Sequence, residues 1–264
     1  MSDQANQTIT ALRAGHDELA ARVSGMTPDD LTQPSAATEW DISQVLSHLG
    51  SGAEIGLATL EAALAGTGNP GPEFNQGVWA RWNAMTPSGQ AEGFLRASDT
   101  LVKRFESLDD TVRAQLRIDL GFLPRPVDVA TAAAMRLIEF TYHTWDIEVM
   151  SDPAAVLAPA AVEFMIDPLG KLIGFLGRSD ALDGRQVTLT VQTAEPDRCF
   201  GLDLRDTVTV VDTPAQPAGV LNAPAEAWLR LAAGRLAPQH TPPTMQLTSD
   251  TITLDDLRRV FPGF

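Results

Sequence analysis

Hydrophobic side chains recur at spacings of three and four residues through most of residues 1–178, a pattern that predicts amphipathic helices. The segments expected to be helical are residues 8–25, 41–60, 73–85, 88–108, 127–150 and 158–177. Asp41 can cap the second of these helices, with Gln44 three residues on as in a capping box, and Pro168 is expected to interrupt the last. Four or five long helices with short connections favour an antiparallel bundle.

After Arg178 the hydrophobic period changes from 3.6 to 2, the period of strands. Alternation runs through residues 187–191, 202–204, 208–210, 245–247 and 252–254, with helices expected at 224–233 and 254–260. The sequence therefore predicts an α+β fold, with a helical bundle over residues 1–178 and a small α+β domain over residues 179–264. The polar segment 178–185 is the expected boundary.

The net charge of the chain disfavours some classes of binding partner. The 34 acidic and 19 basic residues give a net charge of −15. Nucleic acids and anionic membranes attract positive fields, so neither is an expected partner. The first residues lack a basic start followed by an apolar run, and no window of 18 uninterrupted apolar residues occurs, so we expect a cytoplasmic protein. Cys199 is the single cysteine, which excludes a disulfide within the chain and a zinc site built from cysteines.

The residues with chemical potential lie on two predicted helices. Glu139 and His143 are four residues apart, so on a helix they share one face, with Cβ atoms about 6 Å apart, and can reach one cation. His48, on another helix, is the best third ligand among the four histidines of the chain. A His–Glu–His set with one coordination position open is typical of a catalytic zinc site. The same spacing also fits a surface pair or a buried, hydrogen-bonded histidine.

The segments around these residues resemble the DinB-like and mycothiol-dependent maleylpyruvate isomerase family. Residues 40–49 (WDISQVLSHL) are similar to the entry of that family's second helix, and residues 136–147 (RLIEFTYHTWDI) to its second metal-binding helix. In the isomerase branch the ligands are His, Glu and His, which match His48, Glu139 and His143, whereas the DinB branch has a third His where this chain has Ile147. Residues 223–236 and 256–263 look like the C-terminal domain of the same family, so the resemblance covers nearly the whole chain.

The resemblance implies a DinB-like bundle with a divalent metal, which this donor set favours as zinc, and mycothiol as a thiol cosubstrate. The expected partners are thus a low-molecular-weight thiol and a small electrophile, bound by a monomer or homodimer. A thiolate that adds to a conjugated double bond and is then lost yields a cis–trans isomer, whereas a retained adduct defines an S-transferase. Two alternatives stay open: a metal-assisted hydrolase that activates water, and a non-catalytic small-molecule-binding protein.

Two neighbours of the predicted ligands are candidates for supporting roles. Asp146, three residues after His143, can orient that imidazole through a hydrogen bond, or form a plain salt bridge. Arg136, three residues before Glu139, can neutralise the carboxylate or face a substrate carboxylate. The sequence favours the simple neutralising pair.

Two arginines are candidates for contacts to the substrate or thiol. Arg81 lies on a helix rich in aromatic residues, and Arg235 lies in the Gly-Arg segment that resembles the family's second domain. The remaining histidines are not expected to bind metal, since His16 lies on the apolar stripe of the first helix and His240 in a loop. Cys199 lies beside strand residues and is expected to be packed.

Overall fold

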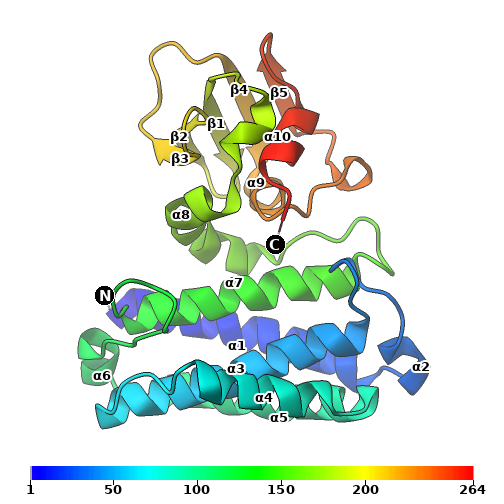
Figure 1. Ribbon diagram of the computed structural model, residues 1–264, viewed down its shortest axis with the longest axis vertical. Coiled ribbons are helices and arrows are strands. Elements are labelled where there is room, and N and C mark those ends of the chain that lie inside the picture. Colours follow the sequence, from blue (N-terminus) through cyan, green and yellow to red (C-terminus); the bar gives the residue numbers. More distant parts are fainter. Residues whose placement is uncertain (1, 264) are drawn as a thin grey trace. The chain divides into compact units, whose positions relative to one another are not determined.

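The computed structural model describes residues 2–263, which form two compact units that meet between Ala155 and Val156 (Figure 1). The first unit is helical, and four long helices that pack on one another form its frame. These are α1 (Ser2–Ser24), α3 (Ile42–Ala65), α5 (Pro87–Glu106) and α7 (Val129–Glu148). Three shorter helices accompany them, α2 (Pro28–Leu31), α4 (Pro72–Asn83) and α6 (Asp110–Gln115). The predicted α+β class, with helices first and a sheet after them, is confirmed.

The ends of α3 follow directly from its sequence. The Asp41 carboxylate accepts the backbone N–H of Gln44 at 2.8 Å, and the Gln44 side chain accepts the N–H of Asp41 at 2.9 Å, so the predicted capping box is confirmed. At the other end Gly66 adopts a left-handed conformation with φ of 68°, which ends the helix without the steric cost that a side chain would impose. The helix that carries His48 therefore has defined limits.

Helix α4 lies tightly against α3 because a glycine leaves room for an aromatic ring. A Cβ atom at Gly50 would lie 2.2 Å from the ring of Trp82, closer than any packed carbon pair allows. Trp82 is 2 % exposed, and its indole N–H donates to Glu54 of α3 at 3.0 Å. These two contacts fix the rotation of α4 about its own axis, and so decide which of its side chains face the neighbourhood of His48.

The second unit combines a five-stranded sheet with helices. Its elements are α8 (Pro159–Leu176), β1 (Thr188–Ala194), β2 (Arg198–Asp203), β3 (Thr209–Val211), β4 (Gly219–Pro224), α9 (Ala225–Ala232), β5 (Gln246–Ser249) and α10 (Leu254–Val260), with 3₁₀ turns at Ser179–Leu182 and Pro238–His240. The strand order is β3-β2-β1-β4-β5, antiparallel except for the parallel pair β1 and β4. Helix α8 packs on α9 and β3.

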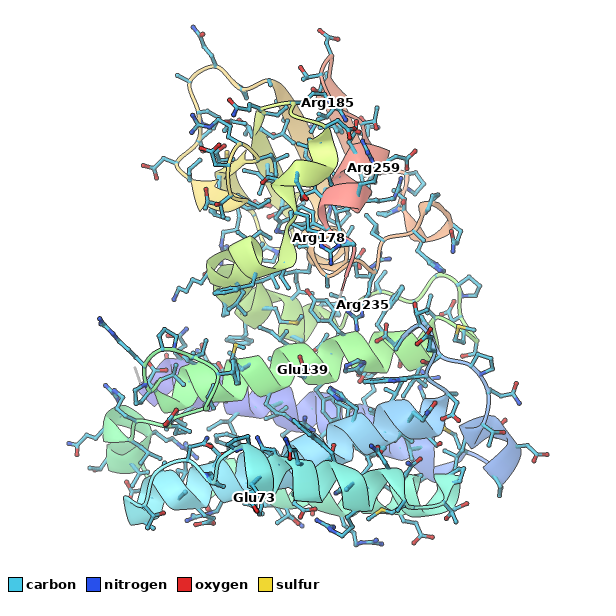
Figure 2. The ribbon with its side chains drawn as sticks, viewed as in Figure 1. Glu73, Glu139, Arg178, Arg185, Arg235 and Arg259 are labelled. Carbon is cyan, nitrogen blue, oxygen red and sulfur yellow. The ribbon has the colours of Figure 1, made fainter. Side chains whose placement is uncertain are left out.

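Two clusters of charged side chains anchor α9 and α10 within this unit. On α9, Arg230 is 2 % exposed and forms two hydrogen bonds with Glu226, at 2.7 and 2.8 Å, and a third to the backbone carbonyl of His240. At the start of α10, Asp256 accepts hydrogen bonds from Arg185, which precedes β1, and from Arg259, three residues on in the same helix (Figure 2). The hydrogen bond from Arg185 is the largest cause that holds the pKa of Asp256 well below its usual value.

The structure differs from the sequence prediction in several details. The compact units meet near residue 155 instead of 178, because α8 packs with α9 and β3 of the second unit. Helix α8 continues through Pro168, since the contacts of α8 compensate for the one hydrogen bond that proline removes. Strand β4 was missed because the segment 219–224 (GVLNAP) lacks alternation and is stabilised by pairing on both sides. Residues 252–254 lead into α10 and are not a strand.

Within residues 2–263, no helix has the length and apolar composition needed to cross a membrane.

Candidate metal centre

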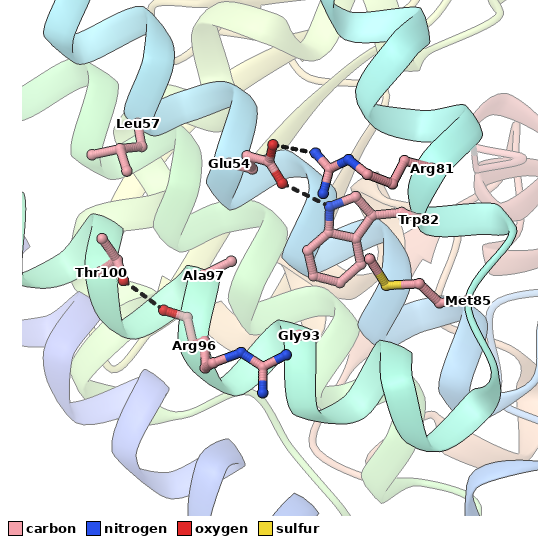
Figure 3. A pocket seen from close by; sticks show the side chains of 9 residues that line it. All are labelled: Glu54, Leu57, Arg81, Trp82, Met85, Gly93, Arg96, Ala97 and Thr100. Carbon is pink, nitrogen blue, oxygen red and sulfur yellow. Dashed lines mark hydrogen bonds and ion pairs between the residues drawn. The ribbon is translucent and has the colours of Figure 1, made fainter.

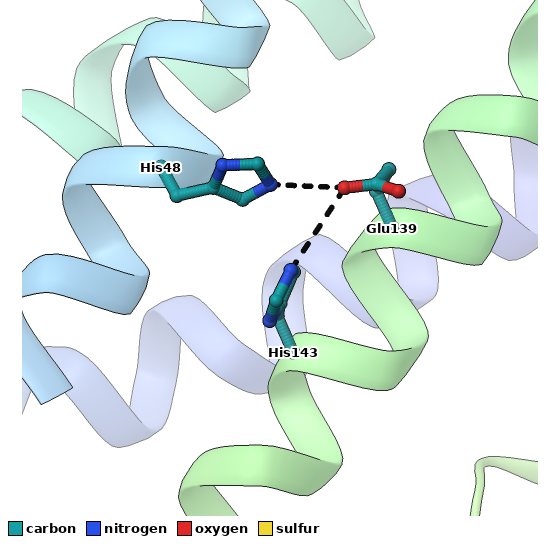
Figure 4. A group of neighbouring side chains, drawn as sticks. All are labelled: His48, Glu139 and His143. Carbon is teal, nitrogen blue, oxygen red and sulfur yellow. Dashed lines mark hydrogen bonds and ion pairs between the residues drawn. The ribbon is translucent and has the colours of Figure 1, made fainter. Parts of the chain in front are cut away.

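Two helices bring the three predicted ligands together. His48 lies on α3, and Glu139 and His143 lie one turn apart on α7, so all three side chains converge (Figure 4). The Nε2 atom of His48 lies 2.9 Å from Glu139 Oε2, and the Nε2 atom of His143 lies 3.8 Å from the same oxygen. One potential ligand atom from each residue lies within 4.8 Å of the other two. No other group of three His, Cys, Asp or Glu side chains in residues 2–263 offers ligand atoms this close.

The donor set fits a divalent transition metal. Zinc bonds to imidazole nitrogen and carboxylate oxygen at about 2.0–2.2 Å, and tetrahedral geometry then separates neighbouring donor atoms by roughly 3.3 Å. The observed separations of 2.9 and 3.8 Å lie on either side of that value. Two nitrogens and one oxygen suit zinc and its neighbours in the first transition row better than magnesium or calcium, which prefer oxygen alone.

A buried carboxylate orients one of the imidazoles. Asp146 is 0 % exposed, and its Oδ2 atom lies 2.9 Å from Nδ1 of His143. An ionised carboxylate accepts hydrogen bonds, so this contact favours the tautomer with the imidazole proton on Nδ1 and the lone pair on Nε2, the atom that lies 3.8 Å from Glu139. The predicted supporting contact of Asp146 is therefore present in the structure.

The electrostatics favour an ionised carboxylate at Glu139. Burial by itself would raise the pKa of Glu139, but the hydrogen bond with His48 and the electrostatic interactions with His143, His48 and Arg136 outweigh burial and lower it. Arg136 acts through space, because its N–H groups are engaged elsewhere: one donates to the backbone carbonyl of Leu49 at 2.6 Å. Burial lowers the pKa of Arg136 to about 10, so the guanidinium remains charged at neutral pH.

An open pocket adjoins the histidine of α3. Trp40 stands over both imidazoles, with ring centroids 5.2 Å from His48 and 6.0 Å from His143. The side chains of His48 and Glu139 are 38 % exposed, whereas that of His143 is 8 % exposed. Two of the three predicted ligands are therefore accessible to solvent, and the third is buried. His48 also lines a pocket of about 400 Å³, within the range of small-molecule sites. A ligand in this pocket can thus reach His48, and the Glu139 side chain is accessible to solvent.

The family of the chain follows from its sequence. The profile described as "Mycothiol maleylpyruvate isomerase N-terminal domain" matches residues 12–148, slightly more than half of the 264 residues, and this range includes all three side chains of the cluster. The chain belongs to this family. The predicted family, and with it the prediction of an enzyme, are confirmed.

Two solved structures resemble this chain in fold over most of its length, including residues of both units. A crystal structure of the mycothiol-dependent maleylpyruvate isomerase, and one of a variant of that enzyme in which a histidine is replaced by alanine, are each 16 % identical to the chain. Each covers 92 % of both chains, with a TM-score of 0.63. At this identity the likeness establishes the fold alone. No curated protein matches the sequence.

Arg81 of this isomerase family member lies on the face of α4 that is turned away from His48. Trp79 and Asn83, four residues apart, line the pocket beside His48, whereas Arg81 and Trp82 line a separate pocket of about 260 Å³ (Figure 3). The guanidinium of Arg81 donates to the Glu54 carboxylate in that second pocket. A helix turns about 100° per residue, which separates the two faces. The expected contact of Arg81 with the substrate is not supported by this position.

The other two arginines form contacts within the protein that the sequence did not predict. Arg136 is not a simple partner of Glu139, because it donates to the backbone of Leu49 on α3 and to the Ser98 hydroxyl on α5 at 3.4 Å. It thereby ties three helices together next to His48. Arg235 lies in the second unit just after α9 (Figure 2), where one of its N–H groups donates to the backbone carbonyl of Ala233 at 3.2 Å.

The remaining candidates are placed largely as expected. His16 is 5 % exposed in the helical core, with Nδ1 at 3.0 Å from Asp17, which confirms a packed histidine. His240 lies in the second unit in a 3₁₀ turn. Cys199 is exposed, contrary to the prediction of a packed side chain, because its position on β2 faces outward.

Four side chains near the site escaped sequence analysis: Trp40, Trp79, Asn83 and Gln90. Trp79 and Asn83 carry a usable signal, since an aromatic and an amide at a spacing of four share one helix face. Which face of α4 turns inward depends on Trp82 and Gly50, which belong to different helices. Because these two residues are 32 positions apart, no local sequence pattern indicates their contact.

Replacement of Asp146 by asparagine should weaken metal binding by about 10- to 100-fold with little change in the fold. The amide can donate to Nδ1 of His143, which moves the imidazole proton to Nε2 and blocks the lone pair. The measurement is the metal dissociation constant by competition with a chelator. Asp128→Asn is the matched control, since asparagine caps a helix as well as aspartate does and this residue caps α7. Equal affinities in the wild type and Asp146→Asn would refute the orienting role.

Proposed function

We propose that this chain is a cytoplasmic, mycothiol-dependent metalloenzyme, an isomerase or S-transferase that acts on a small electrophilic substrate. In this proposal His48, Glu139 and His143 hold one divalent metal, zinc by its donor preferences. The observation that carries the proposal is the convergence of the three side chains, with ligand atoms within 4.8 Å of one another, where one of them, His48, lines a pocket open to solvent. Family membership supports the thiol, and the pocket supports a small-molecule partner.

In this proposal the metal belongs to the helical unit, which ends at Ala155, and the α+β unit, which begins at Val156, has a supporting role. Arg235 of the second domain is proposed to contact substrate or thiol, as the family resemblance implies. The proposal is compatible with a monomer or a homodimer.

The residues of the site prepare it for a thiol. A divalent metal, when bound here, would lower the pKa of a coordinating thiol and so supply a thiolate nucleophile at neutral pH. Asp146 holds the His143 proton on Nδ1, and the ionised Glu139 offers an oxygen that needs no deprotonation. Trp40 covers the imidazoles on one side and restricts water there. With three protein ligands, a fourth position remains for the sulfur.

Mycothiol should stabilise the zinc-loaded protein against thermal unfolding. Ligand at 100 times its dissociation constant contributes about 2.7 kcal/mol to the free energy of unfolding. Elemental analysis establishes the metal content first, and a thermal-shift series with mycothiol and other cellular thiols follows. The matched control is the metal-free protein, in which the stabilisation by thiol should be much smaller, because the sulfur loses its coordination partner.

The outcome of this series separates the rival functions. A flat response to every thiol, with metal present, would favour a hydrolase that activates water at the same ligands. A protein without metal that still binds small molecules would favour a non-catalytic binding function. If the thiol binds, analysis of the products separates an isomerase, which returns the thiol, from an S-transferase, which retains it in the product.

A further inference from the structure

The pocket beside His48 is lined by aromatic, amide, hydroxyl and imidazole side chains. It lies between the polar face of the first half of α3 and one face of α4, and all of its lining residues belong to the helical unit. The lining residues are Trp40, Gln44, Ser47, His48, Ser51, Trp79, Asn83 and Gln90. Within the described part of the chain no Asp, Glu, Lys or Arg side chain lines it.

The lining offers both donors and acceptors of hydrogen bonds. Gln90 is 5 % exposed, and its amide nitrogen donates to the backbone carbonyl of Trp82 at 3.2 Å, which holds the carboxamide in place. Its carbonyl oxygen has no hydrogen-bond partner among residues 2–263, although the side chain lines the pocket. The Gln44 oxygen is engaged by the backbone of Asp41, which leaves the amide N–H groups of Gln44 to donate. Ser47, 4 % exposed, adds a hydroxyl.

Aromatic surface completes the pocket. Trp79 is 47 % exposed and Trp40 is 37 % exposed, although large aromatic side chains are usually buried. The face of an indole attracts C–H groups that carry a partial positive charge, and it gains dispersion energy from a flat saturated ring. Neutral amides and hydroxyls pair with ligand hydroxyls without the desolvation cost of a charge.

We infer that this pocket binds an uncharged, polyhydroxylated ring, the sugar or cyclitol portion of the thiol cosubstrate. A buried ligand carboxylate is best paired with a Lys or Arg side chain, and within residues 2–263 neither type lines the pocket, so the pocket favours the thiol over an anionic electrophile. His48 lies at the edge of the pocket, so a ring bound against Trp79 and Asn83 places an attached sulfur next to the cluster. This inference rests on the proposed function, since it supplies the binding site for the thiol.

The chemistry of mycothiol provides the probes. Mycothiol joins N-acetylcysteine through an amide bond to an uncharged glucosamine–inositol pair, so the neutral N-acetylcysteine amide is the thiol without the rings. N-acetylglucosaminyl-inositol supplies the rings without the thiol. Zinc-loaded protein should bind mycothiol at least about tenfold more tightly than N-acetylcysteine amide, a difference of about 1.4 kcal/mol. The ring fragment alone should bind, as seen by titration in NMR spectra, and should compete with mycothiol.

The decisive variant is Trp79→Ala combined with Asn83→Ala. Both side chains are exposed on α4, so the variant is expected to fold as the wild type does. Mycothiol should bind at least about tenfold more weakly, whereas N-acetylcysteine amide binding and metal content should stay within about twofold of the wild type. Phe74→Ala is the matched control, because it removes a 39 % exposed aromatic of the same helix that does not line the pocket.

The outcomes separate this inference from the function on which it rests. Fragment binding that the double variant abolishes, without binding of any thiol by the wild type, would support the pocket and overturn the thiol function. Thiol binding with no fragment binding, or with equal mycothiol affinities in the wild type and double variant, would overturn the pocket and leave the thiol function intact. Absence of binding by every probe would overturn both.

Discussion

Replacement of His48 by alanine should remove most of the bound metal and with it the thiol-dependent activity. Structural zinc sites with four ligands bind with roughly 10–16 kcal/mol, so one ligand accounts for about 3–4 kcal/mol, or a 10²- to 10³-fold weaker affinity. His48 is the best residue for testing whether the three side chains bind the metal, because its side chain is partly exposed and its removal leaves no buried cavity. The measurements are metal content per chain after dialysis and the melting temperature of the metal-free protein.

His143 requires a more conservative change. Its side chain is 8 % exposed and its Nδ1 atom lies against Asp146, so alanine would leave a buried carboxylate without that partner. His143→Gln retains a side-chain donor and should lose metal as His48→Ala does. The control is His240→Ala in the second unit, which removes an imidazole but keeps the backbone carbonyl that Arg230 uses. Stoichiometric metal in either His48→Ala or His143→Gln would sink the assignment of the ligands.

Replacement of Arg230 by alanine should destabilise the second unit by about 3–5 kcal/mol. Arg230 is the largest fully buried side chain described, and its guanidinium forms two short hydrogen bonds with Glu226. Truncation leaves a mostly buried carboxylate without that partner and a cavity where the long side chain was. The measurement is denaturant unfolding followed by a probe local to the sheet, such as hydrogen exchange of the backbone amides that pair β1 with β4.

The double variant Arg230→Met, Glu226→Leu tests the reason for that loss. Hydrophobic residues of similar volume that replace both partners of a buried ion pair are often neutral for stability. The double variant should therefore recover most of the stability that Arg230→Ala loses. A double variant as unstable as Arg230→Ala would mean that the hydrogen bond to the His240 carbonyl, or the packing around it, matters more than the pair.

Much of the fold could be predicted because its signals are local. The capping box of α3 and the helical periods around Glu139 and His143 are encoded within a few residues of each other. Helix α7 was therefore found, and the spacing of its two ligands determined that both side chains leave the same face. Strand β4 lacked such a signal, since GVLNAP becomes a strand only between β1 and β5.

By itself, the sequence determined which side chains could bind a metal: an imidazole and a carboxylate one turn apart, with a second imidazole on another helix. Only the tertiary structure decided that they converge, because the approach of α3 to α7 depends on packing between residues about 90 positions apart. Packing between distant residues also decides why Arg81 and Trp79, two residues apart on one helix, line different pockets. The ring of Trp82 against Gly50 sets the rotation of α4, so that Trp79 lines the pocket beside His48 and Arg81 faces Glu54.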